Sequence, residues 1–217
     1  FIGTEAAFRD VTFSSSTLGI NRTFRVWTGA DYDSSGTTRY PVIYYCHGCG
    51  GSYQGDSYSS YINDGGYTHP LCSISCTYPL TKPFNADFQA FTNDNDVIVV
   101  MLDGGIAGTG GCLNNWFTIQ NSPGMSDTYM NLGNYFKEIV TVVDSIFPTK
   151  PEPQYRAVSG LSMGGHAALD IASQVPHLVR SVSTFCHSPT RFAIGDAHNS
   201  AKTDVQELWR NLRWHST

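Results

Sequence analysis

A serine between two glycines, in residues 155–176 (YRAVSGLSMGGHAALDIASQVP), constrains the fold of this chain more than any other feature. Ser162 lies in the pattern G-x-S-x-G, after a short apolar run and before a helix-like run. On such a sharp strand-to-helix turn, flanking glycines let the backbone close, and the turn lifts the serine hydroxyl clear of the sheet. The pattern predicts that Ser162 is an exposed nucleophile and that a helix begins near Met163. Its alternative interpretation is a Gly-Ser turn without chemistry.

Six short runs rich in β-branched and aromatic residues are predicted to be strands. They occupy residues 8–14, 22–28, 41–46, 97–102, 155–159 and 181–186. The first two alternate in polarity, as half-exposed antiparallel edge strands do, whereas the later ones are continuously apolar, as parallel strands covered on both faces are. Helical patterns alternate with the later strands, which predicts an α/β domain with a mixed, mostly parallel sheet and helices on both faces. A chain of 217 residues that is 41% hydrophobic is long enough for one such domain.

Three helical patterns lie in the second half of the chain. In residues 126–148, apolar side chains recur at spacings of three and four; Ser126 or Asp127 is expected to cap the start, and Pro148 follows the end. The other two patterns occupy residues 163–174 and 201–212. Residues 50–95 are rich in Gly, Tyr and Ser, and only residues 85–91 within them look helical. Long loops of this kind in compact domains are typically functional or mobile.

Charge and composition exclude several classes of partner. Charged residues make up 14% of the chain, the formal net charge is -5, and Lys and Arg form no run, so neither nucleic acid nor an anionic membrane is an expected partner. No segment approaches the roughly 18 consecutive apolar residues of a membrane span. The chain begins FIGTEAAFRD, without Met or a signal-peptide pattern, so we expect a soluble chain with a processed or trimmed start.

The cysteines favour an oxidising environment. They are Cys46, Cys49, Cys72, Cys76, Cys112 and Cys186. Their even number, a composition rich in Ser, Thr, Tyr and Asn, and a glycosylation-type sequon at residues 21–23 favour a secreted or extracellular protein. Cys72 and Cys76 are expected to be oxidised in preference to Cys46 or Cys186, which lie in apolar runs typical of buried thiols. No histidine accompanies the cysteines at zinc-finger spacing, so neither a metal nor another cofactor is expected.

A glycine-rich segment, HGCGG at residues 47–51, directly follows the predicted strand at 41–46. Acyl transfer requires two preorganised N–H donors for the oxyanion, one from the residue after the nucleophile and one from a loop after an earlier strand. The amides of Met163 and Cys49 are the candidate donors of this oxyanion hole. The alternative interpretation of the segment is a flexible turn. His47 is interpreted as a structural hydrogen-bonding residue, with catalytic base as the alternative.

The segments YPVIYYCHGCGGSY, DVIVVMLDGG and RAVSGLSMGGHAALDIA together resemble the putative-esterase family of α/β hydrolases. That family includes esterase D-like enzymes, S-formylglutathione hydrolases, and feruloyl and acetylxylan esterases. The resemblance spans about residues 8–190, and its Gly-Leu-Ser-Met-Gly-Gly motif is quite specific. It implies an α/β-hydrolase fold in which Ser162 is the nucleophile and the Cys49 and Met163 amides form the oxyanion hole. It leaves the substrate open.

The acid and the base of a catalytic triad are harder to find. In α/β hydrolases they follow the nucleophile, in the order serine, acid, histidine, on loops after later strands. Only one predicted strand follows Ser162, and the resemblance implies that both residues lie further on. We therefore expect a single domain that is incomplete at its C-terminus, lacks its last two strands, and by itself shows at most feeble turnover. Within the chain His187 is the main candidate base; the weaker candidates for acid or base are His198, His215, Asp196, Asp204 and Glu207.

Two more positions have open interpretations. Trp116, in the glycine-rich segment GTGGCLNNWF, is either an aromatic platform for a substrate or a core residue. Asp103, in MLDGG at the end of a predicted strand, matches a turn of the family and is interpreted as structural or pocket-lining.

The function most consistent with these features is that of a serine esterase. Ser162 attacks an ester carbonyl, an acyl-enzyme forms, and water releases it. The expected substrate is a small-molecule or carbohydrate-linked ester. Two alternatives share the fold: a catalytically incomplete hydrolase-fold module that binds or has a structural role, and an acyltransferase that uses the same nucleophile. The sequence does not determine the acyl group, the leaving group, the oligomeric state or the disulfide pairing.

Overall fold

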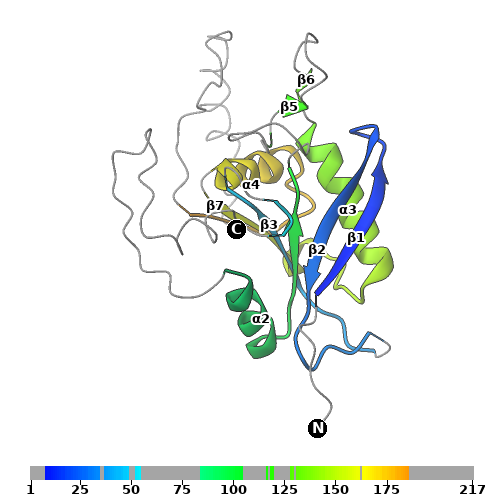
Figure 1. The fold of residues 1–217 in the computed structure, drawn as a ribbon, viewed down its shortest axis with the longest axis vertical. Coiled ribbons are helices and arrows are strands. Elements are labelled where there is room, and N and C mark those ends of the chain that lie inside the picture. The colour runs from blue at the N-terminus through cyan, green and yellow to red at the C-terminus, as the bar shows by residue number, and fades with distance from the viewer. Residues whose placement is uncertain are drawn as a thin grey trace, which may run out of the picture.

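The computed structural model describes residues 8–34, 37–48, 52–54, 84–104, 116, 118–119, 128–129, 131–161 and 163–185. Its main sheet has six strands in the order β1-β2-β4-β3-β7-β8 (Figure 1). Their bounds are β1 Phe8–Ser15, β2 Ile20–Trp27, β3 Val42–Cys46, β4 Ile98–Leu102, β7 Arg156–Leu161 and β8 Ser181–Phe185. A separate two-stranded pair consists of β5 (Thr118–Ile119) and β6 (Thr128–Tyr129).

The strand directions confirm the predicted mixed sheet. β1 and β2 form an antiparallel hairpin, and β2 is also antiparallel to β4. β3 lies between β4 and β7 and is parallel to both, and β8 continues the parallel part beyond β7. All four parallel strands therefore end at the same edge of the sheet.

Two strands differ from the expected exposure. β2 was expected to be a half-exposed edge strand, but it pairs with β1 on one side and β4 on the other, and its last four residues are buried. β8 was expected to be covered on both faces, but its residues alternate between exposed and partly exposed. The reason is position: within the described sheet β8 stands last in the order, with only β7 beside it. An apolar run alone does not distinguish a central strand from an end strand.

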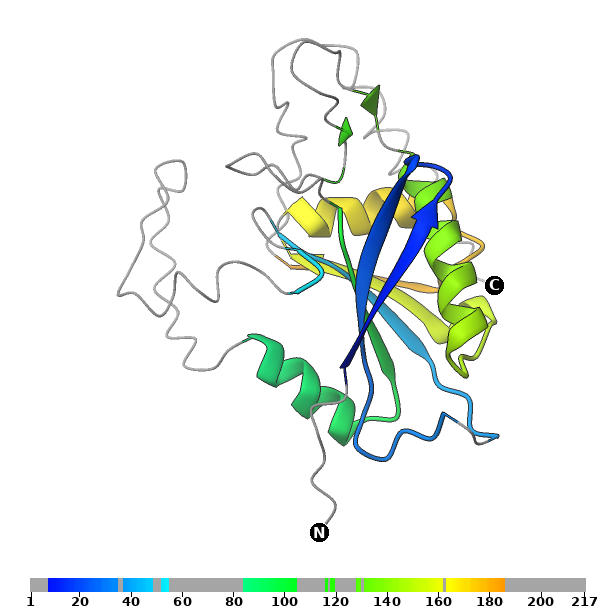
Figure 2. The same ribbon diagram turned by 45° about the vertical axis from the view of Figure 1, so that its right-hand side comes forward.

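Helices cover both faces of the sheet, as predicted (Figure 2). α3 (Leu132–Ile146) and α4 (Met163–Gln174) pack against one face and against each other, and α2 (Phe84–Asp94) covers the other face. A short 3-10 helix, η2 (Pro153–Tyr155), precedes β7. Among the described residues no helix is both long enough and apolar enough to cross a membrane.

The core lies mainly between the sheet and the α3–α4 layer. There the ring of Tyr44 on β3 meets the edge of Phe136 on α3, with centroids 4.9 Å apart. On the opposite face Tyr45, the next residue of β3, contacts Phe88 of α2 with centroids 5.3 Å apart. Successive residues of a strand point to opposite faces. The continuous apolar run in β3 thus supplies both layers at once.

The start of α3 differs from the prediction. The pattern at 126–148 predicted a helix capped by Ser126 or Asp127, but α3 begins at Leu132 and Asn131 caps it, accepting a hydrogen bond from the Asn134 amide. Tyr129, which fits the helical spacing, lies in β6 instead. Pairing of β6 with β5 is a contact between distant residues that a helical period cannot reveal.

The other predicted helices have three different outcomes. The expected bounds of α4, residues 163–174, are confirmed. The helix expected at 85–91 exists and is longer, since α2 runs from Phe84 to Asp94. The pattern at 201–212 lies outside the described residues.

Candidate active site

The ends of three parallel strands bring the candidate residues to one edge of the sheet. Cys46, the last residue of β3, pairs with Leu102 at the end of β4 and with Gly160 on β7. His47 and Asp103 therefore leave the sheet at the same level, next to the end of β7. Open α/β sheets bind ligands at this carboxyl edge.

The junction between β7 and α4 is short and tightly packed. β7 ends at Leu161 and α4 begins at Met163, so position 162 alone separates strand from helix. A Cβ on Gly160 would come within 2.2 Å of the Gly164 carbonyl oxygen, and a Cβ on Gly164 within 2.1 Å of the Cys46 carbonyl oxygen. Both glycines of the motif are thus required by close backbone approach, which seats the first turn of α4 directly on the end of β3.

The predicted catalytic residues are described only in part. Met163 is the first residue of α4 and is partly buried against the core. Ser162, Cys49 and His187 lie outside the described residues, as do the other candidates between positions 196 and 215. The structure therefore places one proposed donor, the Met163 amide, at the N-terminus of a helix, where backbone N–H groups have no partner within the helix.

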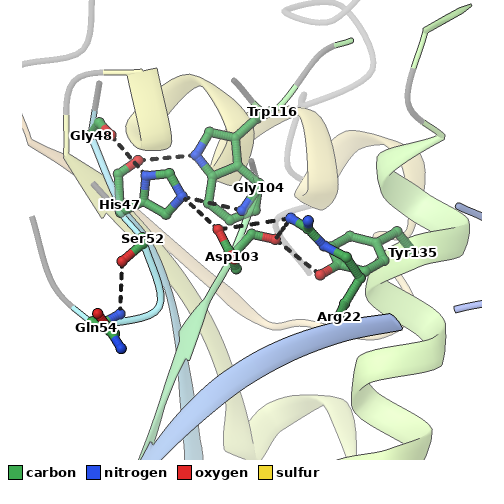
Figure 3. Close-up of polar contacts among 9 residues, drawn as sticks. All are labelled: Arg22, His47, Gly48, Ser52, Gln54, Asp103, Gly104, Trp116 and Tyr135. Atoms are coloured by element: carbon green, nitrogen blue, oxygen red, sulfur yellow. Dashed lines mark hydrogen bonds and ion pairs between the residues drawn. The ribbon is translucent and has the colours of Figure 1, made fainter. Parts of the chain in front are cut away.

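His47 is fully buried and both of its ring nitrogens are engaged (Figure 3). Nε2 lies 3.2 Å from the backbone nitrogen of Gly104, and Nδ1 lies 2.8 Å from the carbonyl oxygen of Gly48. A backbone N–H can only donate, so Nε2 must be the unprotonated acceptor and Nδ1 must carry the proton that is donated to Gly48. The contacts thus select one neutral tautomer of the imidazole.

Asp103 links this histidine to residues on the far side of the site (Figure 3). Its backbone carbonyl accepts hydrogen bonds from Arg22 Nη2 at 3.1 Å and from the Tyr135 hydroxyl at 2.9 Å. Its carboxylate oxygen Oδ1 lies 3.8 Å from Arg22 Nη2 and 3.6 Å from His47 Nε2. The second distance is too long for a hydrogen bond, so the Gly104 N–H remains the hydrogen-bonding partner of Nε2. Burial raises the pKa of Tyr135 to about 12, although Arg22 lowers it, so the hydroxyl keeps its proton and donates at neutral pH.

Sequence analysis did not identify Arg22 or Tyr135. Arg22 could have been recognised from its spacing along β2. Arg22, Phe24 and Val26 are two positions apart, so Arg22 shares with them the face of the strand that turns toward the core. A charged residue at such a position needs a partner. Tyr135 gave no comparable signal, because in the apolar pattern of α3 it looks like any other core residue.

Trp116 is a core residue, which is one of the two roles that the sequence left open; the other was an aromatic platform for a substrate. Its side chain is completely buried, and its indole nitrogen donates a hydrogen bond of 3.0 Å to the backbone carbonyl of His47. The Trp116 and His47 ring centroids are 4.8 Å apart. A Cβ on Gly104 would come within 2.4 Å of the indole. Trp116 therefore packs the His47 ring from inside rather than offering an exposed face to a substrate.

Cys46 and Cys49 have the C-x-x-C spacing of redox and metal motifs, which corrects the expectation from the sequence that the cysteines form no such pair. Cys46, the only cysteine among the described residues, is a buried free thiol. Burial raises its pKa far above the ordinary value, which disfavours the thiolate needed for either chemistry. The described part of the chain contains no group of three His, Cys, Asp or Glu side chains that could hold a metal ion.

Comparison with known proteins identifies relatives of the whole arrangement. A family model described as "Putative esterase" matches residues 15–215. No curated protein matches the chain.

Several solved structures share the fold. An S-formylglutathione hydrolase from Agrobacterium tumefaciens is 17% identical with a TM-score of 0.58, over 87% of this chain and 62% of that one. A ferulic acid esterase from Anaeromyces mucronatus, solved in complex with ferulic acid, is 18% identical with a TM-score of 0.52, over 87% and 61%. A fluorophosphonate-binding serine hydrolase from Staphylococcus aureus is 13% identical with a TM-score of 0.55, over 95% and 72%. The chain thus spans about three fifths of the first two of these proteins.

Proposed function

Because the chain belongs to the "Putative esterase" family and has an α/β-hydrolase-like fold, we propose that it hydrolyses carboxylic esters through an acyl-enzyme on Ser162. In this mechanism the Ser162 hydroxyl attacks the ester carbonyl, and the amides of Cys49 and Met163 donate to the resulting oxyanion. The alcohol leaves, and water then releases the acid.

The junction between β7 and α4 carries this proposal. Because α4 begins at Met163, directly beyond the end of β7 at Leu161, its first N–H groups lie at the edge of the sheet where β7 ends. The contacts of Gly160 and Gly164 bring that helix start onto the end of β3, the strand that leads into the HGCGG segment. Nucleophile, helix amide and loop amide are thus proposed to meet at one edge.

His47 and His187 are the two histidines to compare as the catalytic base. The contacts of His47 already use both of its nitrogens. His187 follows two positions after the end of β8, a strand whose carboxyl end lies at the same edge as those of β3 and β7. It is therefore the candidate base that a variant of this chain can test first.

We propose a small-molecule or carbohydrate-linked ester as substrate, in an extracellular setting. The fungal neighbour was solved with ferulic acid, and another neighbour is named for S-formylglutathione. A panel of methyl ferulate, S-formylglutathione and p-nitrophenyl acetate would separate an aromatic acyl group from a formyl thioester and from a generic activated ester.

The experiment that tests the nucleophile is covalent labelling with a fluorophosphonate probe, followed by peptide mapping, alongside hydrolysis of p-nitrophenyl acetate. We expect labelling on Ser162, and we expect Ser162→Ala to abolish the labelling and to lower p-nitrophenyl acetate hydrolysis to the rate without enzyme. The matched control is Ser145→Ala, which removes an exposed hydroxyl that donates to the Val142 carbonyl. Labelling that persists in Ser162→Ala, or that maps to another residue, would overturn the proposal.

A further inference from the structure

One peptide unit in the site is held at both of its ends. The carbonyl of Asp103 and the N–H of Gly104 belong to the same planar peptide and point in opposite directions. Arg22 and Tyr135 donate to the carbonyl, and His47 Nε2 accepts from the N–H. Two donors on a carbonyl, one of them cationic, polarise the peptide and strengthen its N–H as a donor.

The imidazole of His47 connects the Asp103–Gly104 peptide to a second peptide, the one that follows Gly48. With Nε2 occupied as an acceptor, Nδ1–H donates to the carbonyl of Gly48. That carbonyl belongs to the peptide that joins Gly48 to residue 49. Because the atoms of a peptide unit are coplanar, a hydrogen bond that holds the Gly48 carbonyl restrains the whole peptide unit to which it belongs.

We propose that His47 is a neutral positioning residue that orients the Gly48–Cys49 peptide, held in place by Arg22 and Tyr135 through the Asp103–Gly104 peptide. Its functional consequence rests on the function proposed above, in which the Cys49 amide stabilises the oxyanion. Trp116 completes the arrangement, since it packs on the imidazole and donates to the His47 carbonyl. The His47 side chain is completely buried, so it has no free space in which to rotate and form other hydrogen bonds.

The arrangement predicts a difference between two substitutions of His47. The terminal amide of Asn occupies the position of Nδ1 and can still donate to the Gly48 carbonyl, whereas the terminal amide of Gln reaches the position of Nε2. We expect His47→Gln to lower kcat by about 10²-fold, the effect of losing an oxyanion donor. We expect His47→Asn to recover at least about tenfold of that loss. KM should change little in both, because the oxyanion forms only in the transition state.

Arg22 and Tyr135 have a matched control elsewhere in the sheet. Arg156, at the start of β7, is as buried as Arg22 and pairs with Asp144 at 2.5 Å, but it lies at the opposite edge from the site. Arg22→Met and Tyr135→Phe should lower kcat at temperatures where the protein stays folded, and Arg22→Lys should restore part of it. Arg156→Met should lower the melting temperature comparably and leave kcat unchanged.

A measurement that needs no turnover decides the tautomer. We expect the ¹⁵N spectrum of the His47 ring to show a protonated Nδ1 and an unprotonated Nε2 at pH 7, in the wild type and in Ser162→Ala. A proton on Nε2, or an imidazolium, would overturn the inference. So would unchanged kcat in His47→Gln alongside lost activity in Ser162→Ala, or an equal loss of kcat in Arg156→Met. Activity retained in Ser162→Ala would instead overturn the proposed function, and the ring spectrum would still decide the role of His47.

Discussion

Gly160 and Gly164, which flank the serine at position 162, are explained by contact rather than by backbone conformation. Among the described glycines only Gly19 has a positive φ, at 68°. Gly160 and Gly164 instead leave room for neighbouring carbonyl groups that a Cβ would overlap. The sequence analysis expected these glycines to let the backbone close at a sharp turn, and the approach of Gly160 to the Gly164 carbonyl across position 162 agrees with that expectation.

Gly164→Ala should therefore destabilise the protein even though alanine is the better helix former. The added methyl group would lie 2.1 Å from the Cys46 carbonyl oxygen, so the start of α4 must move away from β3. We expect the free energy of unfolding to fall by about 3 kcal/mol, the upper end of overpacking costs, measured by urea denaturation. The control is Ser173→Ala in the last turn of α4, where the hydroxyl donates to the Asp170 carbonyl. Equal stability of Gly164→Ala and wild type would contradict the contact.

At the scale of elements, α3 is tied to the β1–β2 hairpin by a single carboxylate. Glu138 of α3 accepts hydrogen bonds from the hydroxyls of Ser15, Ser16 and Thr17 and from the Thr17 amide. Partial burial alone would raise the pKa of Glu138, but these hydrogen bonds outweigh it and lower the pKa. The hairpin turn is therefore held by a group that must stay ionised.

The contribution of Glu138 to stability should depend on pH with a definite sign. Its pKa is lower in the folded than in the unfolded state, so the stabilisation is complete above the ordinary carboxyl pKa of about 4.5 and is lost as the pH falls through the folded-state value. Glu138→Gln should cost about 1 kcal/mol at pH 7 and progressively less as the pH falls below the ordinary carboxyl pKa. Thermal melts from pH 3 to pH 7 would measure this, with Lys137→Gln, exposed on the same helix, as control. A pH-independent difference would refute the carboxylate's role.

Local patterns predicted the elements better than the contacts between them. The bounds of α4 follow from sequence because its apolar spacing, its glycine-rich start and the preceding strand all agree. The start of α3 could not be predicted in this way, since Tyr129 fits the helical period and yet lies in β6. Glu138 offered no signal at all: its partners are more than 120 positions away, and nothing local distinguishes it from a solvated glutamate.

At the scale of the molecule, local features of the sheet and of the site were predictable from the sequence, whereas contacts between distant residues were not. The mixed character of the sheet was predictable from polarity patterns, whereas the order β1-β2-β4-β3-β7-β8 was not, because it depends on which distant strands pair. The residues around His47 come from β2, α3 and the ends of β3 and β4, and only the two strand ends carried a motif. Arg22 and Tyr135 become recognisable as site residues only when that order is known.

The fold also predicts the reactivity of Cys46, the one cysteine among the described residues. Cys46 lies inside the sheet with its side chain fully buried, and burial raises the pKa of its thiol, so thiolate is scarce at pH 8. We expect iodoacetamide to leave Cys46 unmodified in the native protein and to alkylate it only after unfolding in guanidinium, as measured by peptide mass mapping. The same non-reducing map tests the proposal that Cys72 and Cys76 are oxidised. Alkylation of native Cys46 would show that the end of β3 opens readily.

The two edges of the sheet are connected very differently. At the edge where β3, β4 and β7 begin, the connections are residues 28–41, 95–97 and 147–155, whereas at the edge where β3 and β4 end they are residues 47–83 and 103–131. Insertions in these longer segments, away from the buried residues His47 and Trp116 and from the β5–β6 pair, would leave the pairings of the six-stranded sheet unchanged. We therefore expect a laboratory library diversified in these two segments, with His47, Asp103, Gly104 and Trp116 kept unchanged, to alter the substrate preference of the proposed esterase with little effect on folding stability.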